Sequence, residues 1–129
     1  VEHRLLPDQS VEDVLALWEA AIVRLNGADP DFAGSVEVDF TRPGYELDRA
    51  APIVRTLEAA YRGVTNEPPV FSGMSAWLDS AILGRAGIPT VIYGPRGDGF
   101  HAAVEYVELS SVFRCAEVIA RAVSAWMDG

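Results

Sequence analysis

A short apolar run, Ile88–Tyr93, lies between two glycines and follows a helical pattern. Its continuous hydrophobicity and its β-branched residues are typical of a strand that is buried on both faces. The glycine-rich loop Gly94–Gly99 comes next, and His101 follows it. In α/β folds, functional sites form beyond the carboxyl ends of strands. This order therefore predicts an α/β fold with its chemistry in the loop after the apolar run.

Periodicity predicts the elements around this run. Ser10 is a suitable N-cap for a helix that ends at Gly27, and Val1–Leu6 and Ser35–Thr41 show the pattern of strands on either side of it. Three further helices are expected over residues 49–63, 75–86 and 109–127. In the last helix, the residues expected to face inward are Val112, Phe113, Ala116, Ile119, Ala120, Val123 and Trp126.

Composition restricts the class of protein. Net charge is −9 in 129 residues, and all ten basic residues are dispersed arginines. Neither nucleic acid nor an anionic membrane is therefore an expected partner. The apolar runs are shorter than the roughly 20 residues that span a bilayer, and VEHRLLPD lacks the pattern of a signal peptide. With a single cysteine, Cys115, a reducing compartment and hence the cytoplasm are expected.

His101 and Glu105 are four residues apart and could converge on one site. They could be a metal-ligating imidazole and its neighbouring carboxylate. Spacing alone, however, fits a surface histidine in a polar loop better. A catalytic zinc site needs three protein ligands, and the only other histidine, His3, lies far away in the chain. The residues by themselves therefore leave the role of His101 open.

The loop GPRGDG lacks the features of a phosphate-binding motif, since no Lys-Ser/Thr follows it. Its glycine amides and Arg96 could instead bind a carboxylate. Asp79 lies on the preceding predicted helix, where it could face the site or be a solvated helix residue. No serine has the setting of a hydrolase nucleophile.

The segment from Gly73 to Val107 resembles the C-terminal portion of the acetylornithine deacetylase, succinyl-diaminopimelate desuccinylase and carboxypeptidase G family of zinc metallopeptidases and deacylases. The start of the chain, Glu2–Asp8, is similar to a strand of that family's inserted lid, or dimerisation, domain. The resemblance covers essentially the whole chain. The matching positions are Gly73, Leu78-Asp79-Ser80-Ala81, Gly87-Ile88-Pro89, Gly94-Pro95-Arg96-Gly97, His101 and Glu105-Tyr106-Val107.

The resemblance implies a fold and a set of roles. Residues 1–47 would be the latter part of the lid, a mixed α+β portion, and residues 48–129 the C-terminal α/β segment of the catalytic domain. His101 would be a metal ligand, and Asp79 and Glu105 would support the site. The complete enzyme would hold two metal ions, zinc or alternatively cobalt or manganese, and form a homodimer through the lid. The loop residues expected to bind substrate are Gly94, Arg96 and Gly97.

The implied reaction is hydrolysis of N-acyl amino acids or small peptides by a metal-activated water. The general base and the other metal ligands of the family have no counterpart in these 129 residues. No catalytic residue is therefore assigned, and the chain alone is expected to be inactive and not to hold metal stably. Two alternatives stay open: a non-catalytic dimerisation or interaction module, and a metal-free carboxylate-binding domain.

Overall fold

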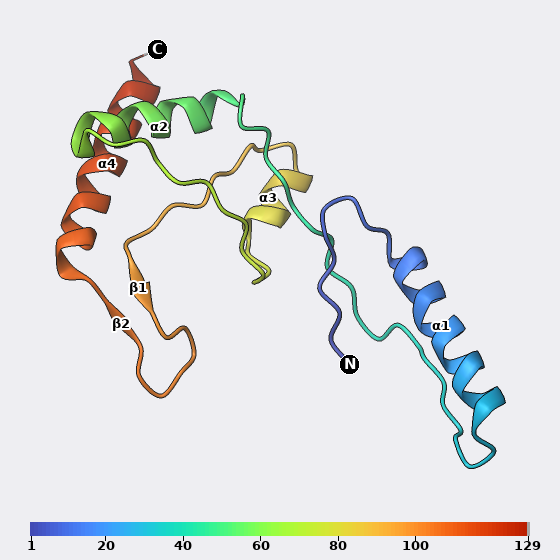
Figure 1. Cartoon of the computed structure of the whole chain (residues 1–129). Helices are drawn as coiled ribbons and strands as arrows, with labels where there is room; N and C mark the ends of the chain where they lie inside the picture. Colours follow the sequence, from blue (N-terminus) through green and yellow to red (C-terminus); the bar gives the residue numbers. More distant parts are fainter. Residues whose placement is uncertain (129) are drawn as a thin grey trace. The chain divides into compact units, whose positions relative to one another are not determined.

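The computed structural model describes residues 1–128 and divides the chain into two compact units (Figure 1). Unit 1 comprises Val1–Glu46 and Ser75–Ala81, and unit 2 comprises Leu47–Met74 and the residues from Ile82 onward. Four helices and one small antiparallel sheet make up the regular structure of the described chain, in agreement with the α/β class. The assignment of residues 1–47 to a lid and of 48–129 to a catalytic domain stays a prediction.

Unit 1 is built on helix α1, Val11–Ala28. The Ser10 hydroxyl oxygen accepts a hydrogen bond from the Asp13 backbone N–H at 3.0 Å, and the hydroxyl donates to the Asp13 carboxylate at 2.6 Å. This side chain satisfies a backbone N–H that the first turn of a helix leaves unpaired. The predicted helix start at Ser10 is thereby confirmed, and the helix ends one residue beyond the predicted Gly27.

The two strands predicted around α1 are wrong. Neither Val1–Leu6 nor Ser35–Thr41 belongs to a sheet, because the only ladder in the described residues joins Gly97–Asp98 to Tyr106–Val107. Alternation predicts a strand only where a neighbouring strand pairs with it and a core covers its apolar face. Here Phe40 is 66% exposed, so that face is uncovered.

The chain on either side of α1 is attached to this helix by hydrogen bonds of polar side chains, and not by strand pairing. The Trp18 indole N–H donates to His3 Nδ1 at 3.4 Å, with the two rings edge to face. Further along α1, the amide of Asn26 both donates to the carbonyl of Gly34 and accepts from its N–H. A side-chain amide can bond a backbone in both directions, as a strand neighbour would.

Unit 2 is built on helix α2, Pro52–Thr65, and helix α4, Leu109–Met127, which pack together (Figure 1). Their shared core consists of Ala60, Val118 and Ala122, with Leu57, Tyr61, Val64 and Tyr93 packed around it. Val118 is fully buried. Small side chains at this contact let the helices approach closely, and the rings of Tyr61 and Tyr93 close one side edge to face.

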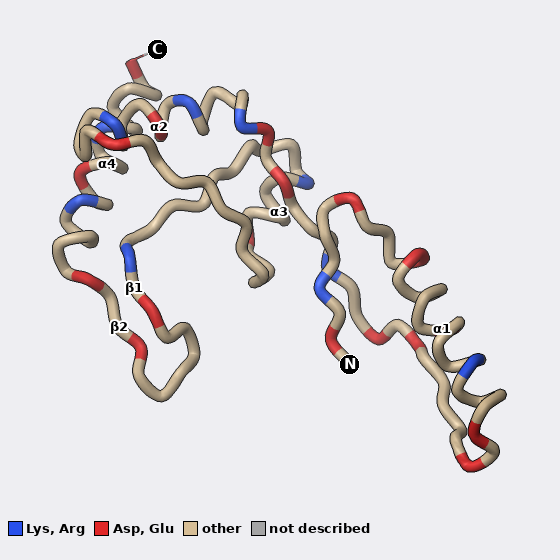
Figure 2. The backbone as a smooth tube through the Cα atoms, viewed as in Figure 1, with Lys and Arg blue, Asp and Glu red and all other residues tan. Residues whose placement is uncertain are grey.

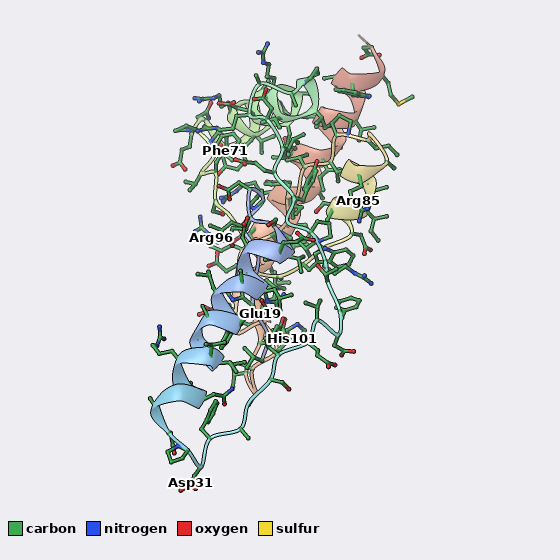
Figure 3. All side chains as sticks on the ribbon, turned by 90° about the vertical axis from the view of Figure 1, so that its right-hand side faces the viewer. Glu19, Asp31, Phe71, Arg85, Arg96 and His101 are labelled. Carbon is green, nitrogen blue, oxygen red and sulfur yellow. The ribbon has the colours of Figure 1, made fainter. Side chains whose placement is uncertain are left out.

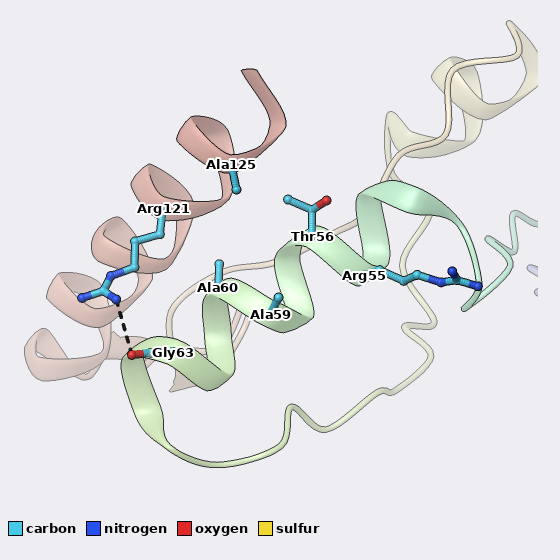
Figure 4. Close-up of a pocket in the computed structure, with 7 residues that line it drawn as sticks. All are labelled: Arg55, Thr56, Ala59, Ala60, Gly63, Arg121 and Ala125. Carbon is cyan, nitrogen blue, oxygen red and sulfur yellow. Dashed lines mark hydrogen bonds between the residues drawn. The ribbon is translucent and has the colours of Figure 1, made fainter. Parts of the chain in front are cut away.

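A hollow lies along the same helix pair, lined by Arg55, Thr56, Ala59, Ala60, Gly63, Arg121 and Ala125 (Figure 4). Across it, the guanidinium of Arg121 donates to the carbonyl of Gly63 at 3.5 Å and pairs with Glu117 at 2.7 Å. None of the residues that the sequence predicts for a site lines this hollow. It therefore belongs to the helix packing rather than to the candidate site.

The predicted α4 is confirmed in its bounds but not in its buried face. The buried residues are Cys115, Val118 and Ala122. All seven residues expected to face inward are exposed, with Phe113 at 74%. The reason is that α2 covers only the stripe of small side chains, and no described element covers the adjacent stripe of large ones.

The apolar run Ile88–Tyr93 is not a strand, and it is not buried on both faces, because Ile88 and Ile92 are each about half exposed. A strand of the parallel, doubly covered type needs neighbours on both edges, and the described residues offer none here. The helix before it, α3, spans Ser80–Arg85, which is shorter than the predicted range 75–86. The helix predicted over residues 49–63 is confirmed as α2, shifted by a few residues.

Candidate functional site

The candidate site in unit 2 is a β-hairpin that leads directly into α4 (Figure 1). Strand β1, Gly97–Asp98, pairs antiparallel with strand β2, Tyr106–Val107, in the register Gly97 opposite Val107 and Asp98 opposite Tyr106. The loop 99–105 joins the strands and carries His101. The sequence predicts a loop over Gly94–Gly99, and this prediction is wrong at Gly97 and Asp98, which form β1.

His101 is in a tight turn at the end of the hairpin. The Ala102 N–H donates to the carbonyl of Gly99 at 2.8 Å, which closes a four-residue turn with His101 in its third position. His101 has φ 60°, in the left-handed region that this turn position requires. Its side chain is exposed (Figure 3). The turn therefore presents the imidazole to solvent, where a ligand or another part of a longer protein can reach it.

Two glycines allow the hairpin strands to approach each other. A Cβ atom at Gly97 would meet the carbonyl oxygen of Tyr106, and one at Gly99 would meet the carbonyl oxygen of Val104. Gly99 also has φ 81°. Side chains at either position would push the strands apart. The glycines that look like a ligand-binding loop in the sequence therefore have a structural role in the hairpin as well.

Glu105, four residues after His101, is exposed in the same loop. Between residues 1 and 128, His101 and Glu105 share no hydrogen bond or ion pair. The chain thus places them in one loop without joining them. The sequence interpretation of Glu105 as a supporting residue stays a prediction.

Arg96 lies at the base of the hairpin, immediately before β1 (Figure 3). Its side chain is exposed, and its guanidinium has no ion-pair partner in the part of the chain that the structure describes. Its backbone is held by Ser111 and Glu108 at the start of α4. No motif in the sequence singles out Ser111, because its contact with Arg96 depends on the strand register. Gly94 precedes this base in an irregular segment.

Asp79 belongs to unit 1, where it is exposed and lies just before α3. The helix predicted to carry it starts one residue later, so Asp79 lies in a turn. The same segment is anchored by Trp77, whose ring contacts the guanidinium of Arg42 at 5.0 Å from the ring centre. Arg42 also stacks on Phe40 at 4.1 Å. Such cation–π contacts attach the segment to unit 1.

The described residues do not form a metal centre. Across residues 1–128, no three His, Cys, Asp or Glu side chains lie where they could hold one ion together. Acidic residues outnumber basic ones in residues 96–112, where Asp98, Glu105 and Glu108 are accompanied by Arg96. Figure 2 shows this excess of acidic over basic positions along the backbone of the hairpin. His101 could therefore contribute one ligand, but the other ligands of a zinc site would have to come from outside these residues.

Comparison with known proteins agrees with the sequence resemblance. A profile of peptidase family M20/M25/M40 matches residues 6–125. The acetylornithine deacetylase of Myxococcus xanthus is 31% identical across the whole chain, and the alignment covers 33% of that relative. The chain thus spans about a third of its length.

Two further relatives match over shorter parts. The N-formyl-4-amino-5-aminomethyl-2-methylpyrimidine deformylase of Bacillus subtilis is 33% identical over 65% of this chain and 20% of the relative. The peptidase T of Listeria welshimeri is 33% identical over 67% of this chain and 22% of the relative. No solved structure matches with significance.

Within the described residues, no helix is long and apolar enough to span a membrane. From the extent of the profile match, the chain belongs to peptidase family M20/M25/M40.

Proposed function

We propose that this chain is the C-terminal portion of a metal-dependent amidohydrolase or exopeptidase that acts on N-acyl amino acids or small peptides. The observation that carries the proposal is the match to acetylornithine deacetylase across the entire chain, including the hairpin that exposes His101. A deacetylase, a deformylase and a peptidase among the relatives support a substrate with an acyl group on nitrogen.

Within that enzyme, His101 is proposed as one ligand of a dinuclear metal site, with zinc as the metal. The residues present do not fit a complete site, since no group of three metal-ligating side chains occurs among the described ones. Catalytic zinc needs three protein ligands. The chain by itself is therefore proposed to be inactive, with Asp79 and Glu105 in supporting roles.

The base of the hairpin is proposed to bind the carboxylate of the substrate. Arg96 supports this assignment because its guanidinium is exposed and has no ion-pair partner among residues 1–128. A planar guanidinium donates two parallel hydrogen bonds to a carboxylate. Gly94 and Gly97 flank it without side chains that would obstruct the ligand. The same free guanidinium also favours the second candidate function, a carboxylate-binding domain that uses no metal.

The proposal for His101 is tested by titrating the chain with Zn²⁺ and following both histidine imidazoles by NMR. We expect zinc to shift the His101 resonances, weakly because a single ligand binds, and the His101→Ala variant to lose that response. His3→Ala is the matched control, since His3 is the only other histidine. A zinc response that survives His101→Ala and disappears in His3→Ala would remove His101 from the metal site.

Inactivity of the isolated chain is tested by assaying hydrolysis of N-acetylated amino acids with and without zinc. No turnover is expected in either condition, because the general base and most ligands are absent. Turnover that depends on zinc and on His101 would show that this part of the proposal is wrong. We also propose that the chain forms a homodimer through residues 1–47. Sedimentation of residues 1–47 and of residues 48–129, each measured separately, would test which of the two segments associates.

A further inference from the structure

The base of the hairpin shows an unusual form of strand pairing. The register places Arg96 opposite Glu108, one pair beyond Gly97 and Val107. In an antiparallel ladder, every second pair exchanges two backbone hydrogen bonds. The first of these bonds is present, because the Glu108 N–H donates to the carbonyl of Arg96 at 2.9 Å. The second would run from the Arg96 N–H to the carbonyl of Glu108.

Glu108 is also the N-cap of α4, and this changes where its carbonyl points. The carbonyl oxygen accepts from the N–H of Ser111 at 2.9 Å and from that of Val112 at 3.2 Å. The Glu108 carbonyl therefore points along the axis of α4 and is the first backbone acceptor of that helix. A strand residue whose carbonyl already serves a helix cannot complete the ladder directly.

The Ser111 hydroxyl fills this gap. Its oxygen accepts from the Arg96 N–H at 2.9 Å and lies 2.6 Å from the carbonyl of Glu108. A hydroxyl has one proton to donate and two lone pairs to accept with. The contact from the hydroxyl to the Arg96 carbonyl is longer, at 3.2 Å, so the proton goes to Glu108. The missing ladder bond is thus relayed from Arg96 through Ser111 to Glu108.

We propose that Ser111 is a positioning residue for the candidate site: its hydroxyl fixes Arg96 and the base of the hairpin that carries His101. Each strand has only two residues, and so short a hairpin is barely stable by itself. The relay ties it to the 19-residue helix α4, which packs on α2. The importance of Arg96 for a substrate carboxylate rests on the proposed function, whereas the relay itself does not.

The test compares three variants of the chain. Ser111→Ala removes the hydroxyl, Ser111→Thr keeps it, and Ser110→Ala is the matched control at an exposed serine in the same helical turn. Amide hydrogen exchange is measured at Arg96, Asp98 and Glu108, and far-UV circular dichroism follows the helices. N-acetylglycine is then titrated as a carboxylate probe, with the Arg96 and Gly97 amides as reporters.

In Ser111→Ala we expect exchange at these amides to become about fivefold faster, the factor that one net hydrogen bond contributes. Ser111→Thr is expected to restore the wild-type rate, and Ser110→Ala to leave it unchanged, with equal helix content in all variants. The inference is overturned if Ser111→Ala exchanges like Ser110→Ala, or if Thr does not rescue it.

The probe distinguishes this inference from the proposed function. If wild-type chain binds N-acetylglycine, Ser111→Ala should weaken that binding about fivefold, and unchanged binding would contradict the positioning role. If wild-type chain shows no saturable response, the carboxylate role of the loop fails. In that event, the exchange rates and the Thr rescue still decide whether Ser111 holds the hairpin.

Discussion

The two apolar stripes of helix α4 differ in burial. The stripe of Cys115, Val118 and Ala122 is buried, and Val118 and Ala122 share a core with Ala60 of α2. The stripe that includes Phe113 and Trp126 is exposed. The exposed stripe has the larger side chains and so the greater tendency to leave water. Helix α4 therefore has two apolar surfaces, of which only the one with the smaller side chains is covered in the described residues. This agrees with a chain that spans about a third of its deacetylase relative.

The largest effect is expected from a charge in the buried stripe. Val118→Asp should lower the free energy of unfolding by about 3 kcal/mol or more, because Val118 is fully buried and an unpaired carboxylate there has no partner. Urea unfolding followed by circular dichroism, at a concentration where the chain is monomeric, measures this loss.

The matched control is Val123→Asp on the same helix, where the side chain is 51% exposed. Its effect on unfolding should stay within about 0.5 kcal/mol. Similar losses in the two variants would mean that the stripes do not differ as the structure shows.

A moderate effect is expected from the exposed stripe on self-association. Besides the proposed homodimer through residues 1–47, we expect the exposed stripe to cause further self-association, which Phe113→Ser combined with Trp126→Ser should weaken by about tenfold or more. Sedimentation velocity over a range of concentrations gives the constant. Arg114→Ser, an exposed polar position on the same helix, serves as the control and should not change it. Association that is insensitive to the double variant would point to another surface, such as residues 1–47.

A smaller effect is expected from alkaline pH on the buried stripe. Burial raises the pKa of Cys115 above its usual 9.0. The pKa of Tyr93 is raised mainly by burial, then by Cys115 and Tyr61, with Arg114 opposing. A raised pKa in the folded state means that the neutral thiol and phenol stabilise the fold below their ordinary pKa values. That contribution is lost as pH rises through the higher folded-state values.

Unfolding free energies measured between pH 7.5 and 10.5 should therefore fall at the alkaline end in the wild type. The fall should be shallower in Cys115→Ala combined with Tyr93→Phe, which removes both titrating groups. An equal fall in both proteins would assign the alkaline loss to other groups.

Helix positions could largely be predicted from the sequence. Ser10 marks the start of α1, and the periodic apolar residues give the bounds of α4 at Leu109 and Met127. These features depend on neighbours within one or two turns, so they are local. The strands could not be predicted in the same way. Ile88–Tyr93 has the composition of a buried strand, but a strand requires a partner, and the described chain supplies none.

Some features of the candidate site could likewise be predicted from the sequence, and others could not. Residue order together with the resemblance was enough to identify the family, which the profile match confirms. The roles of His101 and Arg96 that the resemblance implies stay predictions. The exposure of His101 in a left-handed turn and the relay through Ser111 became visible only with the hairpin register.

The sequence by itself determined that four helices form and, for α1 and α4, where they begin and end, because capping and periodicity act over a few residues. Only the tertiary structure decided which stripe of α4 is buried, which apolar runs pair, and how Arg96 is held. Burial, pairing and side-chain contacts of this kind depend on which surfaces, often far apart in the sequence, pack against one another. Many large apolar side chains of residues 1–128 stay exposed, so the contacts among these residues are too few to bury them.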